Sequence, residues 1–243
     1  MNIKGSIALV TGANRGIGRT YVKALLDRGA AKVYAAARDT ASLADLAADP
    51  RVVPLALDVT NAAQIAAAAR TASDVTLLVN NAGVANGGDL LRADVVQAAR
   101  QEMEVNYLAP LALAQAFAPA LAAAGGGGVI NVLSFLSLAA PRGSVTYSAS
   151  KAASLFMTRG LRAFLAGQGT RVVATMPVQV ETDMGRNLPE PRLTPEEVVA
   201  ESLDSLENGV DEHFPGELSR RAHTAFTADP KGFQARFLAG GAQ

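Results

Sequence analysis

The sequence predicts an α/β protein built on a doubly wound parallel sheet of about seven strands, with helices on both faces. Short β-branched runs alternate with longer helical patterns along the chain, which is the order of a parallel sheet with right-handed crossovers. The runs at residues 74–83 and 128–134 are almost continuously apolar, as strands buried on both faces are. Polar and glycine residues gather after the runs, at the sheet edge where such folds bind ligands.

The elements are expected in the following order. A strand at 6–12 leads into a helix over 18–29, which a glycine ends. A later helix is expected to begin near Thr194 and Pro195, a good N-cap followed by a first-turn proline. No linker or repeat divides the chain, so one domain over residues 1–243 is the simplest organisation. The other strands are expected at 32–38, 51–59, 74–83, 128–134, 170–177 and 212–216.

The composition excludes several classes of function. Of the 243 residues, 49% are hydrophobic and 18% are charged, which is enough for a large core. The 22 basic and 22 acidic residues cancel, which argues against nucleic acid or an acidic membrane as a partner. The chain has no cysteine, so neither a disulfide nor a thiolate metal site can form. His213 and His223 lack ligand spacing, and we expect no metal site.

One long uncharged stretch, residues 105–141, raises the question of a membrane span. A span needs about 20 consecutive apolar residues, and this stretch is broken by polar, proline and glycine residues. A buried helix, a glycine turn and a buried strand fit it better. The apolar run at 7–10 is too short for the core of a signal peptide. We therefore expect a soluble, cytoplasmic protein.

The segment TGANRGIG, residues 11–18, has the features of a phosphate-binding loop. It follows the first expected strand and opens the first helix. Its glycines at 12, 16 and 18 permit a tight turn and a close backbone approach to a pyrophosphate. The free N–H groups and positive dipole end of the helix would face the same anion. A glycine motif alone also fits a plain tight turn, but the strand–loop–helix context favours a dinucleotide site.

Two arginines near this loop point to the form of the dinucleotide. Arg15 stands at a helix N-terminus, where a cation is unfavourable by about 0.3–1 kcal/mol unless an anion meets it. Arg38 follows the second strand, and Ala37 stands where an acidic residue would favour a free ribose 2′-hydroxyl. Two converging guanidinium groups would suit a 2′-phosphate. NADP(H) is therefore the preferred cofactor, NAD(H) is not excluded, and two solvated arginines are the alternative.

Taken together, the motifs resemble the short-chain dehydrogenases/reductases, the single-domain Rossmann-fold kind of about this length. The match covers the first three-quarters of the chain in the right order and spacing. Each motif alone has an ordinary structural explanation, such as a turn, a strand end or a solvated lysine. The set comprises TGxxxGxG at 11–18, Asp58 in LDVT, NNAG at 80–83, Asn106, Ser134 and Tyr147-x-x-x-Lys151.

The resemblance implies a role for each matching residue. Ser134, Tyr147 and Lys151 would form the catalytic set, and Asn106 would hold a water chain. Asp58 and Val59 would contact the adenine, and Val180 and Thr182 the nicotinamide. The full expected cofactor set is Gly12, Asn14, Arg15, Gly16, Ile17, Gly18, Arg38, Asp58, Val59, Asn81, Ala82, Gly83, Tyr147, Lys151, Pro177, Val180 and Thr182.

Physical chemistry makes the tyrosine–lysine pair plausible. Tyr147 and Lys151 are four residues apart, so a helix places them on one face. A tyrosine pKa near 10 is too high for proton exchange at neutral pH, and lowering it by about 3 units takes about 4 kcal/mol. We expect Lys151, with the charge of the oxidised nicotinamide, to supply much of that. Ser134 would orient the substrate oxygen beside the phenol.

The last quarter of the chain departs from the family pattern. Val178 follows Pro177 where the family usually has glycine, and valine tolerates a positive φ poorly. Residues 183–197 are expected to form a substrate lid, or else an ordinary linker. The tail, about 215–243, carries phenylalanines in helical-looking segments in place of a glycine-rich strand. A homodimer is the minimum expected assembly, with a tetramer open.

These observations lead to an NADP(H)-dependent oxidoreductase that acts on a ketone, an aldehyde or a secondary alcohol. Asn86, Leu136, Leu138 and Pro141 are candidate walls of its substrate pocket. A non-catalytic dinucleotide sensor or scaffold of the same fold is the alternative. An enzyme of this fold that catalyses dehydration or epimerisation is a third possibility.

Overall fold

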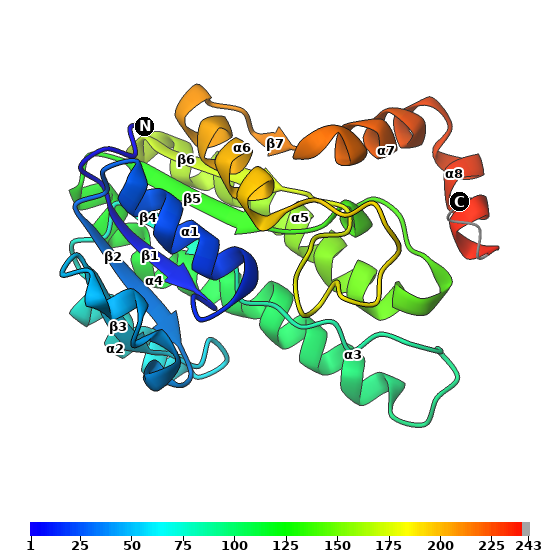
Figure 1. The fold of residues 1–243 in the computed structure, drawn as a ribbon, viewed down its shortest axis with the longest axis horizontal. Coiled ribbons are helices and arrows are strands. Elements are labelled where there is room, and N and C mark those ends of the chain that lie inside the picture. The colour runs from blue at the N-terminus through cyan, green and yellow to red at the C-terminus, as the bar shows by residue number, and fades with distance from the viewer. Residues whose placement is uncertain (240–243) are drawn as a thin grey trace.

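The sheet in the computed structural model has seven strands, all parallel, in the order β3-β2-β1-β4-β5-β6-β7 (Figure 1). The order reverses between β1 and β4, which is the signature of a doubly wound sheet. The predicted fold class is therefore confirmed. The structure describes residues 1–239. The strands are β1 (Ile7–Thr11), β2 (Lys32–Ala37), β3 (Val52–Ala56), β4 (Leu77–Asn80), β5 (Gly127–Val132), β6 (Thr170–Thr175) and β7 (Glu212–His213).

Helices cover both faces of the sheet. One face packs against α1 (Gly16–Asp27) and α6 (Pro195–Asn208). The other packs against α2 (Ala62–Thr71), α4 (Ala109–Ala123) and the end of α5 (Val145–Leu165). Successive residues of β1 alternate between the two cores: Ala8 and Val10 enter the first, and Leu9 enters the second. This double burial explains why the central strands are apolar at nearly every position.

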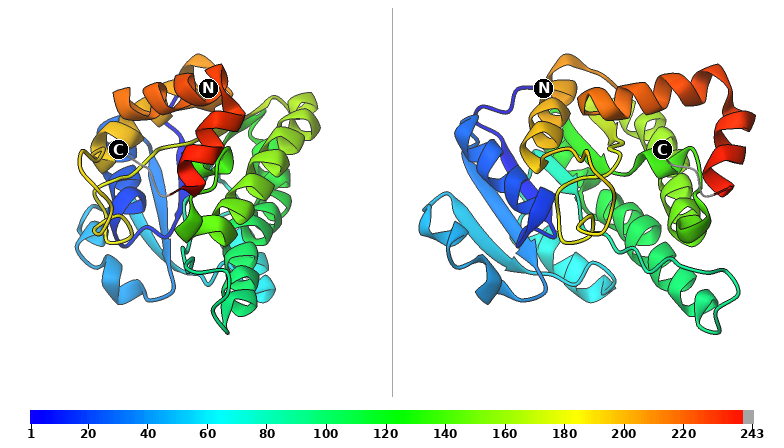
Figure 2. Two further views of the ribbon diagram at one scale, coloured as in Figure 1. Left: turned by 90° about the vertical axis from the view of Figure 1, so that its right-hand side faces the viewer. Right: turned by 45° about the vertical axis from the view of Figure 1, so that its right-hand side comes forward.

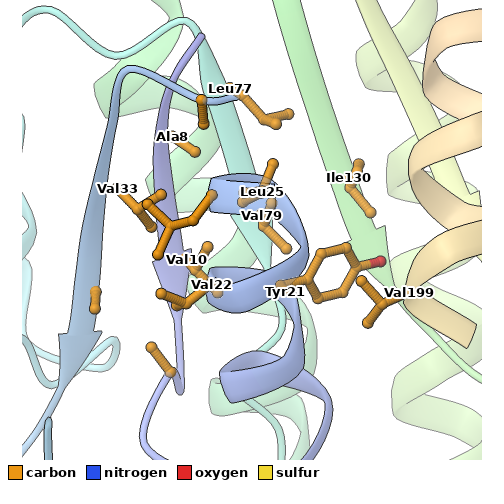
Figure 3. Packing of buried hydrophobic residues seen from close by; sticks show 14 of the residues in the cluster. Ala8, Val10, Tyr21, Val22, Leu25, Val33, Leu77, Val79, Ile130 and Val199 are labelled. Atoms are coloured by element: carbon orange, nitrogen blue, oxygen red, sulfur yellow. The ribbon is translucent and has the colours of Figure 1, made fainter. Parts of the chain in front are cut away.

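Helix α1 shows how the first core is filled (Figure 3). Its residues Tyr21, Val22 and Leu25 lie over the central strands and reach Val199 of α6. The Tyr21 hydroxyl, fully buried, donates to Ser202 Oγ at 2.6 Å, so burial does not leave it without a partner. The expected cap at the start of α6 is also present, because Thr194 accepts from the backbone N–H of Glu197 at 3.1 Å.

The long uncharged stretch falls into the elements that the sequence predicted. A continuous helical run comprises α3 (Val95–Met103), a π-helical turn η3 (Glu104–Leu108) and α4, and a glycine turn then leads into β5. Within residues 1–239, this one run, Val95–Ala123, is long and apolar enough to cross a membrane by length and composition alone. Leu113, Phe117 and Leu121 of α4 are buried against the sheet, which is the pattern of a core helix.

The C-terminal tail lies to one side of the sheet as two helices, α7 (Gly216–Ala228) and α8 (Pro230–Leu238) (Figure 2). Phe226, Phe233 and Phe237 of these helices surround Phe135, with ring centroids 5.5–6.4 Å away. Phe135 opens a short turn, η4 (Phe135–Ser137), directly after Ser134. The tail therefore packs behind the segment that carries Ser134. Residues 240–243 of the predicted tail lie outside the described residues.

Candidate active site

The phosphate-loop segment adopts a conformation that needs its glycines. Gly12 and Gly16 have φ of +63° and +48°, the left-handed region that glycine adopts without strain. Position 18 accepts only glycine for steric reasons, because a Cβ there would overlap the carbonyl oxygen of Gly12 and the side chain of Asn81. Helix α1 begins at Gly16, two residues earlier than predicted, and no side chain caps its first turn. Its N–H groups are therefore available to an anion, and the loop fits a pyrophosphate.

The NNAG segment is fastened to this loop. Asn81 Nδ2 donates to the carbonyl oxygens of Thr11 and Gly12 at 2.9 and 3.2 Å. The backbone N–H groups of Asn81 and Ala82 both donate to Thr11 Oγ1, at 3.0 and 3.1 Å. The ends of β1 and β4 are thereby held together at the point where the strand order reverses. This is the position at which doubly wound sheets bind ligands.

The two arginines behave differently. Arg38 is exposed at the end of β2, and its charge helps to hold the pKa of Asp58 below its usual value, after the larger effect of hydrogen bonds from Thr60. Arg15 also lines the cleft, but its Nη1 pairs with Asp183 Oδ2 at 3.0 Å, across the cleft from the loop. Asp183, the first residue of the predicted lid, thus forms an ion pair with Arg15, which is expected to contact the cofactor.

Tyr147 and Lys151 line the cleft, and Ser134 lies next to Tyr147 without lining the cleft itself. Ser134 follows the end of β5, and Tyr147 and Lys151 lie one turn apart on α5. Ser134 Oγ accepts from the Leu136 N–H at 3.1 Å, and the Ser134 side chain also lowers the pKa of Tyr147. Lys151 Nζ lies 5.8 Å from the centroid of the Tyr147 ring and donates to the Val132 carbonyl at 2.9 Å.

Burial dominates the proton affinities of this group. Desolvation raises the pKa of Tyr147 to about 12, and Glu102 adds to the rise while Ser134 opposes it. Desolvation also lowers the pKa of Lys151 to about 8. The expected lowering of the Tyr147 pKa by Lys151 is therefore not what the chain itself produces. The phenol of Tyr147 is half-buried where it lines the cleft, and the hydration that its anion loses there is the larger effect.

Asn106 lies behind the cleft, in the π-helical turn η3. Its Nδ2 donates to the Val84 carbonyl at 2.8 Å and to Ser150 Oγ at 2.9 Å. Its Oδ1 accepts from the Val84 N–H at 2.9 Å. Because all three partners are part of the protein, the side chain is fully engaged in joining η3 to the segment after β4 and to α5. Single π-helical turns of this kind occur frequently at functional sites.

Fourteen of the predicted site residues line one cleft at the carboxyl edge of the sheet. Gly18, Asn106, Ser134, Pro177 and Val180 do not line it; they lie beneath it or beside it, and all five are buried. The residues that do line it are Gly12, Asn14, Arg15, Gly16, Ile17, Arg38, Asp58, Val59, Asn81, Ala82, Gly83, Tyr147, Lys151 and Thr182.

The cleft also includes residues that the motifs did not single out. Most are apolar and directly adjoin a predicted residue, so their position at a strand end was the available signal. Asp183 is the exception, because its pairing with Arg15 depends on the fold. The further lining residues are Ala37, Leu57, Val84, Val105, Val132, Leu133, Asp183 and Met184. The charged clusters offer no metal site: residues 1–239 hold no group of three or more His, Asp or Glu that could bind a metal ion.

The Pro177–Val178 departure is accommodated without strain. No non-glycine residue in the described part of the chain has a positive φ, Val178 included. The Val178 N–H donates to Ser219 Oγ of α7 at 3.1 Å, and Ser219 is fully buried. The Pro177 carbonyl accepts from Phe135 N–H at 2.8 Å. The loop after β6 is therefore held by the tail and by η4.

Comparison with known proteins places this site in a family. The model of the short chain dehydrogenase family matches residues 6–193, more than three-quarters of the chain. The protein therefore belongs to the short-chain dehydrogenase family, and the resemblance seen in the motifs is confirmed.

Particular relatives extend the likeness. A short chain dehydrogenase from Burkholderia cenocepacia J2315, solved in complex with NADP, superposes with a TM-score of 0.92 at 45% identity, over 98% of this chain and 99% of that one. The NADPH-bound carbonyl reductase from chicken fatty liver gives a TM-score of 0.79 at 33% identity, over 84% of this chain and 92% of that one. The D-erythrulose reductase of Gallus gallus is 36% identical over 188 residues, 76% of each chain.

Proposed function

We propose that the protein is an NADP(H)-dependent oxidoreductase that interconverts a ketone or aldehyde with the corresponding alcohol. The observation that carries the proposal is that Tyr147 and Lys151 line the same cleft as a phosphate-type glycine loop, with Ser134 next to Tyr147. Family membership supports the general class of oxidoreductase. The carbonyl substrate class is supported by the relatives named above.

The preference for NADP(H) is supported by two independent observations. Two of the solved relatives carry NADP or NADPH. In this chain, Arg38 and Arg15 line the cleft, and the position before Arg38 is alanine rather than an acidic residue. A guanidinium group suits a 2′-phosphate, whereas a carboxylate would repel it. The loop glycines and the uncapped start of α1 would hold the pyrophosphate.

The proposed chemistry assigns each side chain a separate task. When bound, NADP(H) supplies or accepts the hydride. Tyr147 holds a proton on its phenol oxygen, and with a pKa of about 12 it stays protonated at neutral pH, ready to donate to a carbonyl oxygen. Ser134 Oγ orients that oxygen beside the phenol, and Asn106 braces α5 from behind.

Lys151 carries the electrostatic part of the proposal. With a pKa of about 8, it is mostly protonated at neutral pH, and it lies against the ring of Tyr147. Its positive charge favours the phenolate that remains after proton donation. Its hydrogen bond to the Val132 carbonyl fixes the position of that charge. Lys151 therefore tunes the proton exchange even though burial sets the resting pKa of Tyr147.

The decisive test replaces Tyr147 with phenylalanine. We expect Tyr147→Phe to reduce the rate of NADPH oxidation with a panel of ketones and aldehydes by about 10²–10⁴-fold, since the proton donor is lost. NADPH binding, followed by fluorescence titration, should change little. A variant that reduces carbonyls at the native rate would refute the proposal. A dinucleotide sensor would instead show binding without activity in both proteins.

We also propose that the protein works as a cytoplasmic homo-oligomer. Phe156 and Phe164 on α5 are 71% and 88% exposed, and Leu108, next to α4, is 42% exposed. Exposed apolar side chains on α5 and directly before α4 support a self-complementary contact around a two-fold axis. Light scattering in solution would distinguish a dimer from a tetramer, and a monomer would contradict the proposal.

A further inference from the structure

Glu102 is a buried carboxylate that the proposed chemistry does not use. It lies on α3, and its exposed fraction is 0%. Its Oε1 accepts from the backbone N–H of Asn86 at 2.7 Å. Its Oε2 is buried and, among the described residues, has no hydrogen-bond partner. A buried carboxylate with one unpaired oxygen is costly, so its presence beside a catalytic helix calls for an explanation.

Glu102 acts together with Asn106 on the segment that follows β4. Figure 1 shows this segment running alongside α3. Asn106 binds both backbone groups of Val84, and Glu102 binds the N–H of Asn86. Four helical residues advance about 6 Å, and two residues of extended chain advance about 6.6 Å. Glu102 and Asn106 are four residues apart on the helical run, and this spacing lets them reach the backbone groups of Asn86 and Val84, which are two residues apart on the segment.

The same segment is held from its other side. Arg92 donates to the carbonyl oxygens of Asn86 and Gly87, at 2.8 and 3.4 Å. Gly87 lies directly against Gly143, since a Cβ on Gly87 would be 3.0 Å from the Gly143 carbonyl oxygen. Residues 84–87 are thus confined between α3 and the turn η5 (Arg142–Ser144) that leads into α5 and Tyr147.

Glu102 also acts on Tyr147 through its charge. Lys151 lies near the Tyr147 ring on α5 itself, and the carboxylate of Glu102 on α3 contributes to the rise in the pKa of Tyr147. Ser134, whose side chain lowers the pKa of Tyr147, and Asn106, which is bound to Ser150 of α5, are neutral. The charged groups of η3 and η5, Glu104 and Arg142, are exposed to solvent, where water screens them.

We propose that Glu102 is a positioning residue for the site: it fixes segment 84–87 beside the substrate site through its hydrogen bond to Asn86, and it places a buried carboxylate within electrostatic reach of Tyr147. This inference rests on the proposed function. Glu102 opposes Lys151, so the pair sets the pH at which the phenol changes from proton donor to proton acceptor. A neutral residue of the same shape would hold the segment without that opposition.

The test separates charge from shape. Glu102→Gln keeps an oxygen acceptor for the Asn86 N–H and removes the charge. The assay is NADP⁺-dependent oxidation of the alcohol formed from the fastest carbonyl in the panel, followed as kcat against pH. Oxidation needs the deprotonated phenol, so we expect the acidic limb of the profile to move to lower pH by about half a unit or more. The KM for the alcohol should change less than about twofold, because the hydrogen bond to the segment remains.

Glu104→Gln is the matched control, since it removes an exposed carboxylate two residues away from Glu102. Its profile of kcat against pH should be the same as that of the unmodified protein. Glu102→Met removes both charge and acceptor, and should shift the profile and also raise KM several-fold. If Glu102→Met fails to fold, Glu102→Gln still decides the charge effect. An unmoved profile in Glu102→Gln, with Tyr147→Phe inactive, overturns this inference alone. An active Tyr147→Phe overturns the proposed function itself.

Discussion

The two sides of Tyr147, the proposed proton donor, are built in different ways. On the cofactor side, contacts between glycines and backbone groups at the ends of β1 and β4 shape the cleft, and Gly18 and Asn81 pack against the Gly12 carbonyl. On the substrate side, side chains from distant segments hold the loops. Gln234 of α8 binds both backbone groups of Ala140, at 2.9 and 2.8 Å, and Ser219 of α7 binds Val178.

This difference explains how one fold can keep its cofactor and change its substrate. The backbone contacts of the cofactor side depend on the absence of side chains, so almost any substitution there is a steric conflict. The substrate side depends on pairs of side chains and loops, which can be exchanged together. We therefore expect the proposed cofactor side to tolerate few substitutions and the proposed substrate side to tolerate many. Three variants test this difference.

The largest effect is expected on the cofactor side, from Gly18→Ala. The added methyl group would overlap the Gly12 carbonyl oxygen, which is backbone and has little room to move. We expect a loss of about 3 kcal/mol in the free energy of unfolding, or about 6–12 °C in Tm for a chain of this size. Thermal unfolding followed by circular dichroism measures it.

Gly160→Ala provides the matched control. Gly160 lies inside α5, where an added Cβ would meet no atom within 4 Å. Alanine is the better helix former, so we expect a gain of up to about 1 kcal/mol. If Gly18→Ala and the unmodified protein unfold at the same temperature, the claim that side chains are sterically excluded from the cofactor side is wrong.

An intermediate effect is expected at the junction of the two sides, from Lys151→Met. The pKa of Lys151 in the folded protein, about 8, lies below the ordinary value of 10.5. Between these two pH values the unfolded chain binds more protons, so the free energy of unfolding rises with pH across that window. From pH 7 to 9.5 the rise should be about 2 kcal/mol, and Lys151→Met should lack it.

At pH 7 the Lys151→Met variant should be the more stable protein, by about 1–2 kcal/mol, because the buried charge is gone and only the hydrogen bond to Val132 is lost in exchange. Its carbonyl reduction should be strongly impaired. Urea unfolding at both pH values measures the stability. A variant that is less stable than the original protein at pH 7 would show that Lys151 contributes to folding rather than opposing it.

A third effect is expected on the substrate side, from Gln234→Ala, and its size is similar to that of Lys151→Met at pH 7. Two partly buried hydrogen bonds to Ala140 are lost, at a cost of about 1–2 kcal/mol. Since Ala140 follows the segment that carries Ser134, KM for the carbonyl should rise several-fold. The Kd for NADPH, from fluorescence titration, should not change.

Gln168→Ala is the control for this variant, since Gln168 also makes two side-chain hydrogen bonds, to Ala118 and Thr170, far from the cleft. It should cost a similar amount of stability and leave KM unchanged. A change in NADPH affinity with an unchanged KM in Gln234→Ala would contradict the division between the two sides.

Much of the fold was predictable because it depends on local pattern. The central strands are apolar at nearly every position because both of their faces are buried, and each predicted strand overlaps an observed one; β5 begins one residue before its predicted start. The edges of elements were less predictable: the run predicted at 212–216 contains a strand of only two residues, Glu212–His213, because β7 pairs with β6 at just two positions. The helical tail was indicated by its spacing, but its packing around Phe135 was not.

The site divides in the same way. Fourteen residues named from motifs line one cleft, because each motif fixes a backbone turn at a strand end. The catalytic roles of Ser134, Tyr147, Lys151 and Asn106 stay predictions. The lowering of the Tyr147 pKa by Lys151 and the oxidised nicotinamide stays a prediction too. In the chain without a cofactor desolvation raises this pKa, and spacing alone does not show how far a side chain is removed from water.

By itself, the sequence determined the parallel sheet, the glycine loop and the tyrosine–lysine pair. Hydrophobic periodicity and backbone geometry act over a few residues, and they can be read from those residues. Only the tertiary structure decided the pairing of Arg15 with Asp183, the placing of Glu102 beneath residues 84–87, and the attachment of α8 to Ala140. These contacts join positions far apart in the chain, and their partners and burial exist only once the helices have packed on the sheet.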